Sequence, residues 1–370
     1  MIDTPVSASF RDPSGFVFVR DDEILRQVND CYAADYDQLI QSGLYEELVD
    51  EGSLVAHEEL QLSQSASPGA YAVLQPERVP FISYPYEWCF GQLQSAALLT
   101  LDIQRRAFDH GMVLKDASAF NVQFVGSKPV FIDTLSFEIY KEGEPWVAYR
   151  QFCQHFLAPL ALLAYVDIQL GNLQRLHIDG VPLDLAARLL PRRTRWKPSL
   201  FLHLHMHSWS QKRAAKPAAK ANSKKKFGQN AMRGLIDNLQ STVKRLKPHR
   251  QNTTWEAYYG NTNYSSSAEQ HKEALIEQFV QTTQPTKVWD LGANSGKFSE
   301  IAAKHAEHVV AFDYDQSCVE QLHEQTSDKV LPLIMDLSNP SPALGWRHQE
   351  RSSLSERRNV AFELRVAFTV

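Results

Sequence analysis

Cysteine is scarce in this sequence of 370 residues. The four cysteines, Cys31, Cys89, Cys153 and Cys318, lie far apart and form no CxxC pair. This spacing argues against a disulfide scaffold, a zinc ribbon and a thioredoxin-type redox centre. Separated cysteines suit a reducing compartment, and we therefore expect a cytoplasmic protein.

Long apolar runs are also missing. The most apolar stretch, residues 156–166, contains Pro159 and falls short of the roughly 18 residues that a membrane-spanning helix requires. The first residues lack both a basic start and an apolar core, so we expect no secretory signal and no membrane span. Hydrophobic residues make up 44% and charged residues 22% of the chain, which excludes a chain that is disordered throughout. The length suits two domains, or one large domain with a substantial extension.

Acidic residues are nearly absent from residues 211–250, where Asp237 stands alone among twelve basic residues. This basic strap carries a net charge of +11, while the rest of the chain carries −16. Its first half is rich in alanine and lysine, which predicts a solvated linker. Its second half has apolar residues at helical spacing before Pro248, which predicts a short amphipathic helix. A contact with nucleic acid or another polyanion through this strap is the alternative, but the lysine run lacks interleaved aromatic residues.

The signals after the strap follow the order of a parallel βαβ unit. A short buried strand, Lys287–Leu291, runs directly into the loop Gly-Ala-Asn-Ser-Gly, and a helical pattern follows from residue 297. A second apolar strand ends in Asp313, about twenty residues after the glycines. The acid that binds the ribose in dinucleotide-type units has the same position. A third strand, residues 330–335, ends in Asp336 and Leu337. The pattern predicts a Rossmann-like α/β unit that binds a nucleotide.

Each residue type in this unit suits one part of a nucleotide ligand. The two glycines of the loop permit a sharp turn and a close approach of the backbone to a ligand. Asp313 can accept hydrogen bonds from both ribose hydroxyls, and Asp336 with Leu337 can contact the edge and face of an adenine. Asp290, which precedes the first glycine, repels a pyrophosphate but suits a positively charged amino-acid or sulfonium group. These residues favour S-adenosylmethionine (SAM) over a dinucleotide.

Three stretches, VWDLGANSG, VVAFDYD and LPLIMDLSNP, resemble the first three motifs of class I SAM-dependent methyltransferases, specifically two-part bacterial proteins of the nodulation-associated type. The resemblance implies a transferase that passes a methyl group from SAM to an acceptor, which the sequence does not identify. Neither the motifs nor their spacing identify a catalytic residue. The residues that the resemblance places at the cofactor are Asp290, Gly292, Asn294 and Gly296 at the methionine end, Asp313 at the ribose and Asp336 at the adenine amine.

Few residues follow the third strand. Only 34 residues remain after Asp336, whereas the sheet of the resembling family continues with a fourth strand and others beyond it. Residues 346–358 suit a polar helix, and residues 360–370 alternate like one half-buried strand, at most the fourth. We therefore expect an incomplete parallel sheet, in a methyltransferase domain truncated after about strand four. An incomplete sheet leaves an apolar edge, which argues against methyl transfer by this chain alone.

The N-terminal half contains no glycine-rich phosphate loop, no HExxH and no GxSxG. Its most informative pattern is Asp116, then Asn121, then a predicted hairpin and Asp133, after a long amphipathic helix over residues 90–110. This order resembles the catalytic loop and metal-binding acid of a protein kinase, and implies a site for Mg-ATP. In such a site Asp116 orients a hydroxyl, while Asn121 and Asp133 hold the metal. The residues around both acids depart from the kinase motifs, so an active phosphotransferase and a pseudokinase both stay open.

Other interpretations of the N-terminal half also stay open. Asp116 and Asn121 can simply cap turns around the hairpin, and the whole chain can be a non-catalytic binding protein. His203, His205 and His207 alternate with apolar residues, so on a strand all three imidazoles share one face. No carboxylate or cysteine nearby completes a zinc site, and we expect no metal there.

The expected architecture has three parts. Residues 1–200 form an α+β domain with a kinase-like arrangement, and residues 201–250 form a basic linker with a short amphipathic helix. Residues 251–370 form a Rossmann-like α/β domain with an incomplete parallel sheet.

Overall fold

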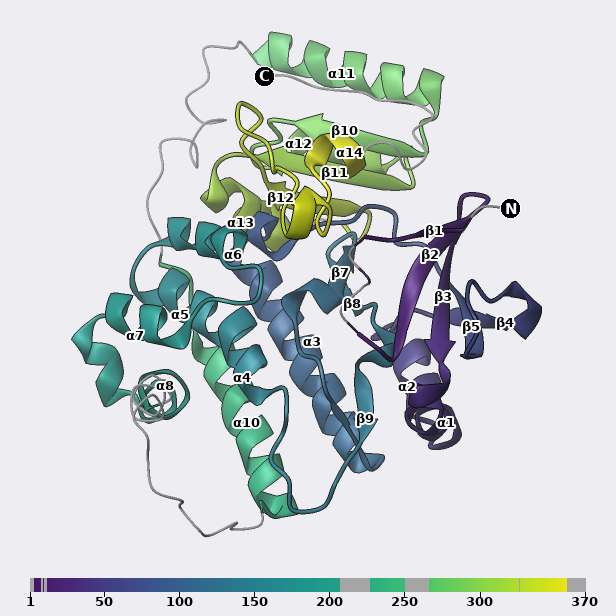
Figure 1. Ribbon diagram of the computed structural model, residues 1–370. Helices are drawn as coiled ribbons and strands as arrows, with labels where there is room; N and C mark the ends of the chain where they lie inside the picture. Colours follow the sequence, from purple (N-terminus) through teal and green to yellow (C-terminus); the bar gives the residue numbers. More distant parts are fainter. Residues whose placement is uncertain are drawn as a thin grey trace. The chain divides into compact units, whose positions relative to one another are not determined.

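The computed structural model describes residues 3–7, 9, 12–206, 227–249, 266–325 and 327–357. The described chain mixes helices and strands and divides into two units (Figure 1). Unit 2 contains two short stretches from the first half of the chain together with the whole C-terminal part. The bounds are Met1–Arg78, Gln94–Val122 and Val130–Lys247 for unit 1, and Val79–Leu93, Gln123–Pro129 and Pro248–Val370 for unit 2.

Unit 1 contains a five-stranded antiparallel sheet in the order β1-β2-β3-β5-β4. The turn between β2 and β3 places Asp21 and Asp22 in the left-handed region, with φ of 49° and 66°, which matches the twist of a tight hairpin. Helices α1 and α2 separate β3 from β4 in the chain. The bounds are β1 (Thr4–Pro5), β2 (Gly15–Arg20), β3 (Glu23–Asn29), α1 (Ala33–Gln41), α2 (Leu44–Asp50), β4 (His57–Leu60) and β5 (Ala70–Pro76).

The rest of unit 1 is mostly helical. The predicted long helix is confirmed as α3 (Phe90–Asp109), and the predicted hairpin as β7 (Val122–Val125) and β8 (Lys128–Phe131), each contributing to unit 1 in part. A second antiparallel pair joins β6 to β9. Helix α10 occupies the stretch in which the sequence predicts a short amphipathic helix. The remaining bounds are β6 (Met112–Leu114), β9 (Phe137–Ile139), α4 (Tyr149–Phe152), α5 (Ala158–Tyr165), α6 (Leu173–Leu176), α7 (Leu183–Leu189), α8 (Pro198–Leu200) and α10 (Gln229–Arg245).

The stretch in which the histidines alternate with apolar residues is not a strand, because α8 continues into a π-helix over Phe201–His205. Both His203 and His205 are buried there, and each forms a hydrogen bond inside unit 1. Their alternation with leucine therefore reflects polar partners in the core rather than the two faces of a strand. His207 and the first half of the basic strap lie outside the described residues.

Unit 2 contains a parallel three-stranded sheet in the order β10-β11-β12. The strand predicted at 287–291 is confirmed as β10, and the next two predicted strands as β11 and β12. Alternate residues of the strands pack against α11 and α12, with Val288, Val309 and Ala311 buried against Ile276 and Phe298. The bounds are α11 (Ser266–Thr283), β10 (Lys287–Leu291), α12 (Lys297–Ala303), β11 (His308–Asp313), α13 (Gln316–Gln325) and β12 (Val330–Ile334).

The other face of this sheet is covered by the stretch Val79–Leu93. Phe81 packs edge-on against Trp289 and Phe312, with ring centroids 5.8 and 6.0 Å apart. Buried Glu87 forms an ion pair with Arg357, the last residue of α14 (Leu354–Arg357). The polar helix predicted over residues 346–358 is present only as a 3-10 turn, Trp346–His348, and as α14. The strand predicted at 360–370 lies outside the described residues.

Candidate functional site

The glycine loop joins β10 to α12 and meets the carboxyl end of β11. The backbone N–H groups of Gly292 and Ala293 both donate to the carbonyl of Phe312, at 2.9 Å each. Gly292 and Gly296 adopt φ of 87° and 83°, and Asn294 also lies in the left-handed region, at 49°. Glycine and asparagine tolerate this conformation best, so the sequence of the loop fits the turn that the backbone makes.

The two glycines of the loop have different surroundings. A Cβ atom built on Gly292 meets no heavy atom within 4 Å, so open space adjoins the backbone there. A Cβ atom on Gly296 would lie 2.1 Å from Cδ1 of Leu322, a buried residue of α13. Gly292 therefore leaves room for a ligand, whereas Gly296 is required for close packing of the loop against α13.

Asp313 links the glycine loop to the end of β11. Its Oδ2 accepts a hydrogen bond from the backbone N–H of Asn294 at 2.7 Å, and its Oδ1 accepts one from Asp315 at 2.8 Å. Burial raises the pKa of Asp313 above its ordinary value, although these two donors favour the charged form. A carboxylate offers about four acceptor positions, so Asp313 keeps capacity for further donors.

Asp290 lies beneath the loop. Its side chain is only 1% exposed, and its Oδ2 accepts a hydrogen bond from the hydroxyl of Ser299 in α12 at 2.6 Å. Burial raises the pKa of Asp290 to about 6, and the nearby charge of Asp313 adds to this effect. The Asp290 side chain thus links β10 to the start of α12 through Ser299, and its charge can attract a positively charged ligand.

The ends of β11 and β12 carry polar and exposed apolar side chains at the same edge of the sheet as the loop. Asp336 follows β12, and its Oδ1 accepts hydrogen bonds from the N–H and hydroxyl of Ser338. These donors lower the pKa of Asp336. Leu337 is 44% exposed, and Tyr314, directly after Asp313, is 70% exposed. Sequence analysis missed Tyr314, although an aromatic residue directly after a strand-end acid in VVAFDYD is a visible signal.

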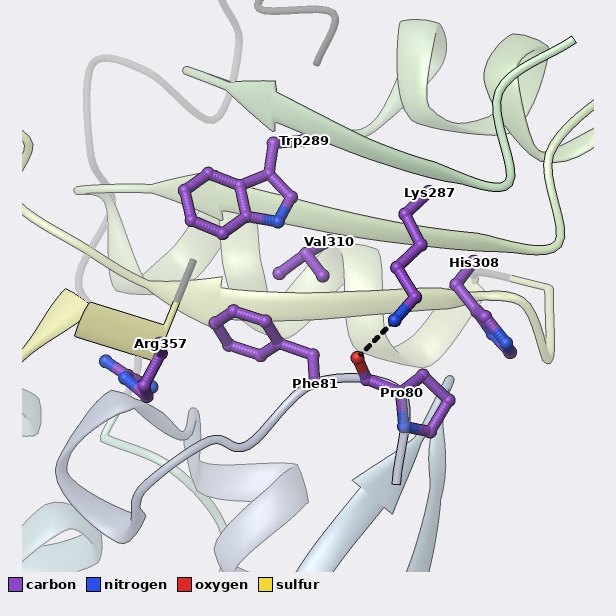
Figure 2. Close-up of a pocket in the computed structure, with 7 residues that line it drawn as sticks. All are labelled: Pro80, Phe81, Lys287, Trp289, His308, Val310 and Arg357. Atoms are coloured by element: carbon purple, nitrogen blue, oxygen red, sulfur yellow. Dashed lines mark hydrogen bonds between the residues drawn. The ribbon is translucent and has the colours of Figure 1, made fainter. Parts of the chain in front are cut away.

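A small pocket of unit 2 lies elsewhere (Figure 2). Lys287 and His308 open the strands β10 and β11, so their side chains mark the amino end of the sheet, opposite the glycine loop. The Lys287 ammonium donates to the carbonyl of Pro80 at 3.3 Å. The cavity volume is about 20 Å³, which suffices for about one water molecule and excludes a nucleotide.

The structure brings together the three residues that the sequence groups in the N-terminal half. The hydroxyl of Ser136 donates to Oδ2 of Asp133 at 2.6 Å, and the side-chain amide of Asn121 donates to the same hydroxyl at 3.1 Å. Asp116 forms a hydrogen bond with Asn121, and burial together with the charge of Asp133 raises the pKa of Asp116. Asp116 and Asp133 also accept N–H groups of their own turns, as the turn-capping interpretation expects.

Sequence analysis missed the basic partner of this cluster, Arg26 of β3. Its guanidinium forms an ion pair with Asp133. Burial disfavours the charged form of Asp133, yet Arg26 and the Ser136 hydroxyl hold the pKa of Asp133 below its ordinary value. No periodic pattern links Arg26 to Asp133, because the two residues meet only through the tertiary fold.

The described residues form neither a metal-binding cluster nor a membrane-spanning helix. Among them, no group of three histidine, cysteine, aspartate or glutamate side chains is placed to hold a metal ion. None of the helices described is long and apolar enough to cross a membrane. The four cysteines are free thiols, of which Cys31 is exposed.

Comparison with known proteins gives one informative relative. No family model matches the chain. A solved structure of vaccinia related kinase 3 matches 75% of this chain and 87% of its own, at 12% identity and a TM-score of 0.29, and this likeness is too weak to carry an argument. The nodulation protein NoeA of Rhizobium meliloti (strain 1021) is 35% identical over 373 residues, which cover 98% of this chain and 78% of the relative. Because this similarity runs along nearly the whole sequence, the chain belongs to the family of the nodulation protein NoeA.

Proposed function

We propose that unit 2 binds SAM at the carboxyl edge of its parallel sheet, and that the protein is a SAM-dependent methyltransferase. The observation that carries the proposal is the contact between Asp313 and the glycine loop. It places a carboxylate with free acceptor capacity beside a loop that leaves open space at Gly292. This pairing is typical of a site for a ribose and its substituents in open α/β sheets.

The residues at this edge fit the parts of SAM. The open space at Gly292 suits the methionine end, and the buried charge of Asp290 beneath the loop favours a positively charged group there. Tyr314 and Leu337, at the ends of β11 and β12, expose apolar surface that can contact the faces of the adenine. Asp336 retains an acceptor oxygen for the adenine amine.

The chemistry asks little of the protein beyond positioning. SAM supplies an electrophilic methyl group on its sulfonium, which a nucleophile of the acceptor attacks in line. Asp313 and the glycine loop would fix the cofactor, and the apolar side chains at the strand ends would exclude water from the reacting atoms. The acceptor is unidentified, and kinship with the nodulation protein NoeA supports a role of the proposed reaction in nodulation.

Calorimetry with SAM and S-adenosylhomocysteine on the whole chain tests this proposal. We expect binding that Asp313→Ala abolishes and that Asp328→Ala leaves intact, because Asp328 is an exposed acid of unit 2 that pairs with Lys128. At a ligand concentration about 100 times the dissociation constant, thermal stability should rise by about 2.7 kcal/mol. Absence of binding, or equal loss in both variants, would refute the proposal.

A second function rests on the cluster in unit 1. Ser136 links Asn121 to Asp133 through hydrogen bonds, and Asp116 lies beside Asn121. The kinase-like interpretation requires Asp116, Asn121 and Asp133 to lie together in this way. The carboxylate of Asp133, which would hold a metal in an active kinase, instead forms an ion pair with Arg26. This pairing favours a pseudokinase over an active phosphotransferase. Thermal shift with ATP, with and without Mg²⁺, tests this. Binding of Mg-ATP should be lost in Asn121→Ala, which removes a metal-holding side chain, and kept in Asp109→Ala, which removes an exposed acid of α3.

A further inference from the structure

The segment from residue 192 to residue 206 forms a rigid helical corner of unit 1. A 3-10 helix, Arg192–Trp196, leads into α8 and the following π-helix, which Figure 1 shows end-on. The hydroxyl of buried Thr194 forms a hydrogen bond with Nε2 of His205 at 2.9 Å. His203 is anchored on both sides, by the hydroxyl of Tyr149 at 2.6 Å and by Asn238 of α10 at 2.8 Å. The buried face of the segment is therefore fixed.

The opposite face of this segment exposes large apolar side chains. Trp196 is 88% exposed, the highest value among the large hydrophobic residues of the described chain. Phe201, Leu202 and Met206 are each 43–45% exposed, and their spacing along the helix places them on one side. Single exposed apolar residues are ordinary, but four within eleven residues mark a site of interaction.

Basic side chains flank Trp196 on both sides in the sequence. Arg192, Arg193, Arg195 and Lys197 are all exposed. Among the described residues, none of these four forms an ion pair with a carboxylate, whereas Arg188, a few residues earlier in the chain, pairs with Asp184. Between Asp184 and Asp237 the sequence contains no aspartate or glutamate at all. The surface therefore combines apolar bulk with basic side chains that have no carboxylate partner among the described residues.

We propose that this surface, formed by Arg192, Arg193, Arg195, Trp196, Lys197 and the exposed side of 201–206, docks onto an anionic lipid bilayer. Basic groups around an exposed tryptophan and aliphatic side chains suit the boundary between headgroups and acyl chains. Single-stranded nucleic acid would instead require several aromatic platforms for its bases. Leu202 and Met206 offer apolar area without such stacking, so the composition favours a bilayer.

Co-sedimentation of the full chain with vesicles tests this surface. We expect binding to vesicles of phosphatidylcholine mixed with phosphatidylserine, little binding to phosphatidylcholine alone, and release when salt rises from about 0.1 to about 0.5 M. Arg193→Gln with Arg195→Gln should weaken binding about 30-fold, because each basic group near an anionic surface contributes about 5-fold. Trp196→Ala should also weaken it.

Matched variants separate this surface from general charge and exposure. Lys244→Gln with Arg245→Gln removes two exposed charges from α10, and Trp346→Ala removes a 72% exposed tryptophan from unit 2. Both should bind vesicles like the unchanged protein. The proposal is overturned if the controls lose binding equally, if anionic vesicles do not bind, or if a single-stranded RNA of mixed sequence binds more tightly and loses affinity in the same patch variants.

Discussion

Replacing Gly296 with alanine should destabilise unit 2 much more than replacing Gly292 with alanine. Both positions have a left-handed backbone, so an alanine costs about 1–2 kcal/mol of backbone strain at either site. Only at Gly296 does the new methyl group also collide, at 2.1 Å, with Leu322. Leu322 lies in the buried cluster beneath the loop, so relieving that collision requires repacking.

The expected difference follows from these contacts. Overpacking a well-packed core costs about 1–3 kcal/mol, which brings Gly296→Ala to a total of about 2–5 kcal/mol. Gly292→Ala carries the strain alone, at about 1–2 kcal/mol. The loss of glycine flexibility in the unfolded chain helps both variants alike and cancels in the comparison. Gly296→Ala should therefore be less stable than Gly292→Ala by about 1–3 kcal/mol.

Hydrogen exchange at the amides of β11 measures the stability of unit 2 without interference from unit 1. We expect these amides to exchange about 5- to 150-fold faster in Gly296→Ala than in Gly292→Ala. In the background Leu322→Ala the difference should shrink, because the colliding side chain is gone. Equal exchange in both variants, or faster exchange in Gly292→Ala, would show that Gly296 is not a packing position. SAM should bind more weakly to Gly292→Ala than to Gly296→Ala, because the open space for the ligand adjoins Gly292.

Three further changes test the buried charges. Because burial raises the pKa of Asp290 to about 6, the folded unit holds this proton more tightly than the unfolded chain, and stability should fall as pH rises from about 4 to about 6. Asp290→Asn should remove this slope in urea titrations and be more stable by about 3 kcal/mol at pH 7; an unchanged slope would contradict it. Arg26→Ala should destabilise unit 1 by about 3 kcal/mol in thermal melts at pH 7 by stranding Asp133, and the loss should shrink once acid protonates that carboxylate. Glu87→Gln should cost unit 2 about 3–5 kcal/mol in hydrogen exchange by leaving buried Arg357 unpaired, whereas replacing both residues with methionine should restore most of it.

Local sequence patterns predicted much of the secondary structure. The strands β10, β11 and β12, the helix α3 and the hairpin β7–β8 were all predictable, because each is a short apolar or periodic run bounded by residues that break it. The position of the glycine loop was predictable for the same reason, since two left-handed glycines follow a buried strand directly. The contact between Asn294 and Asp313 follows from parallel register, which brings the ends of neighbouring strands to one edge.

The histidine segment shows where periodicity misleads. Leucine and histidine alternate over residues 202–205 as on a strand, yet the backbone is a π-helix. His203 forms hydrogen bonds through both ring nitrogens, with Tyr149 and Asn238, and His205 forms one through Nε2 with Thr194. Both therefore behave as core residues rather than as one polar face. A polar side chain can be buried when the fold supplies its hydrogen-bond partners. These partners are distant in the sequence, so no periodic pattern predicts them.

The sequence by itself determined the elements, the glycine loop and the acids at or near the strand ends, because these depend on neighbours within a few residues. Only the tertiary structure decided that residues 79–93 and 123–129 belong with the C-terminal unit, where Phe81 covers the sheet and Glu87 neutralises Arg357. It also decided that Arg26 neutralises Asp133. Burial of a charge demands a partner, but which distant residue supplies that partner is fixed by packing and not by any local pattern.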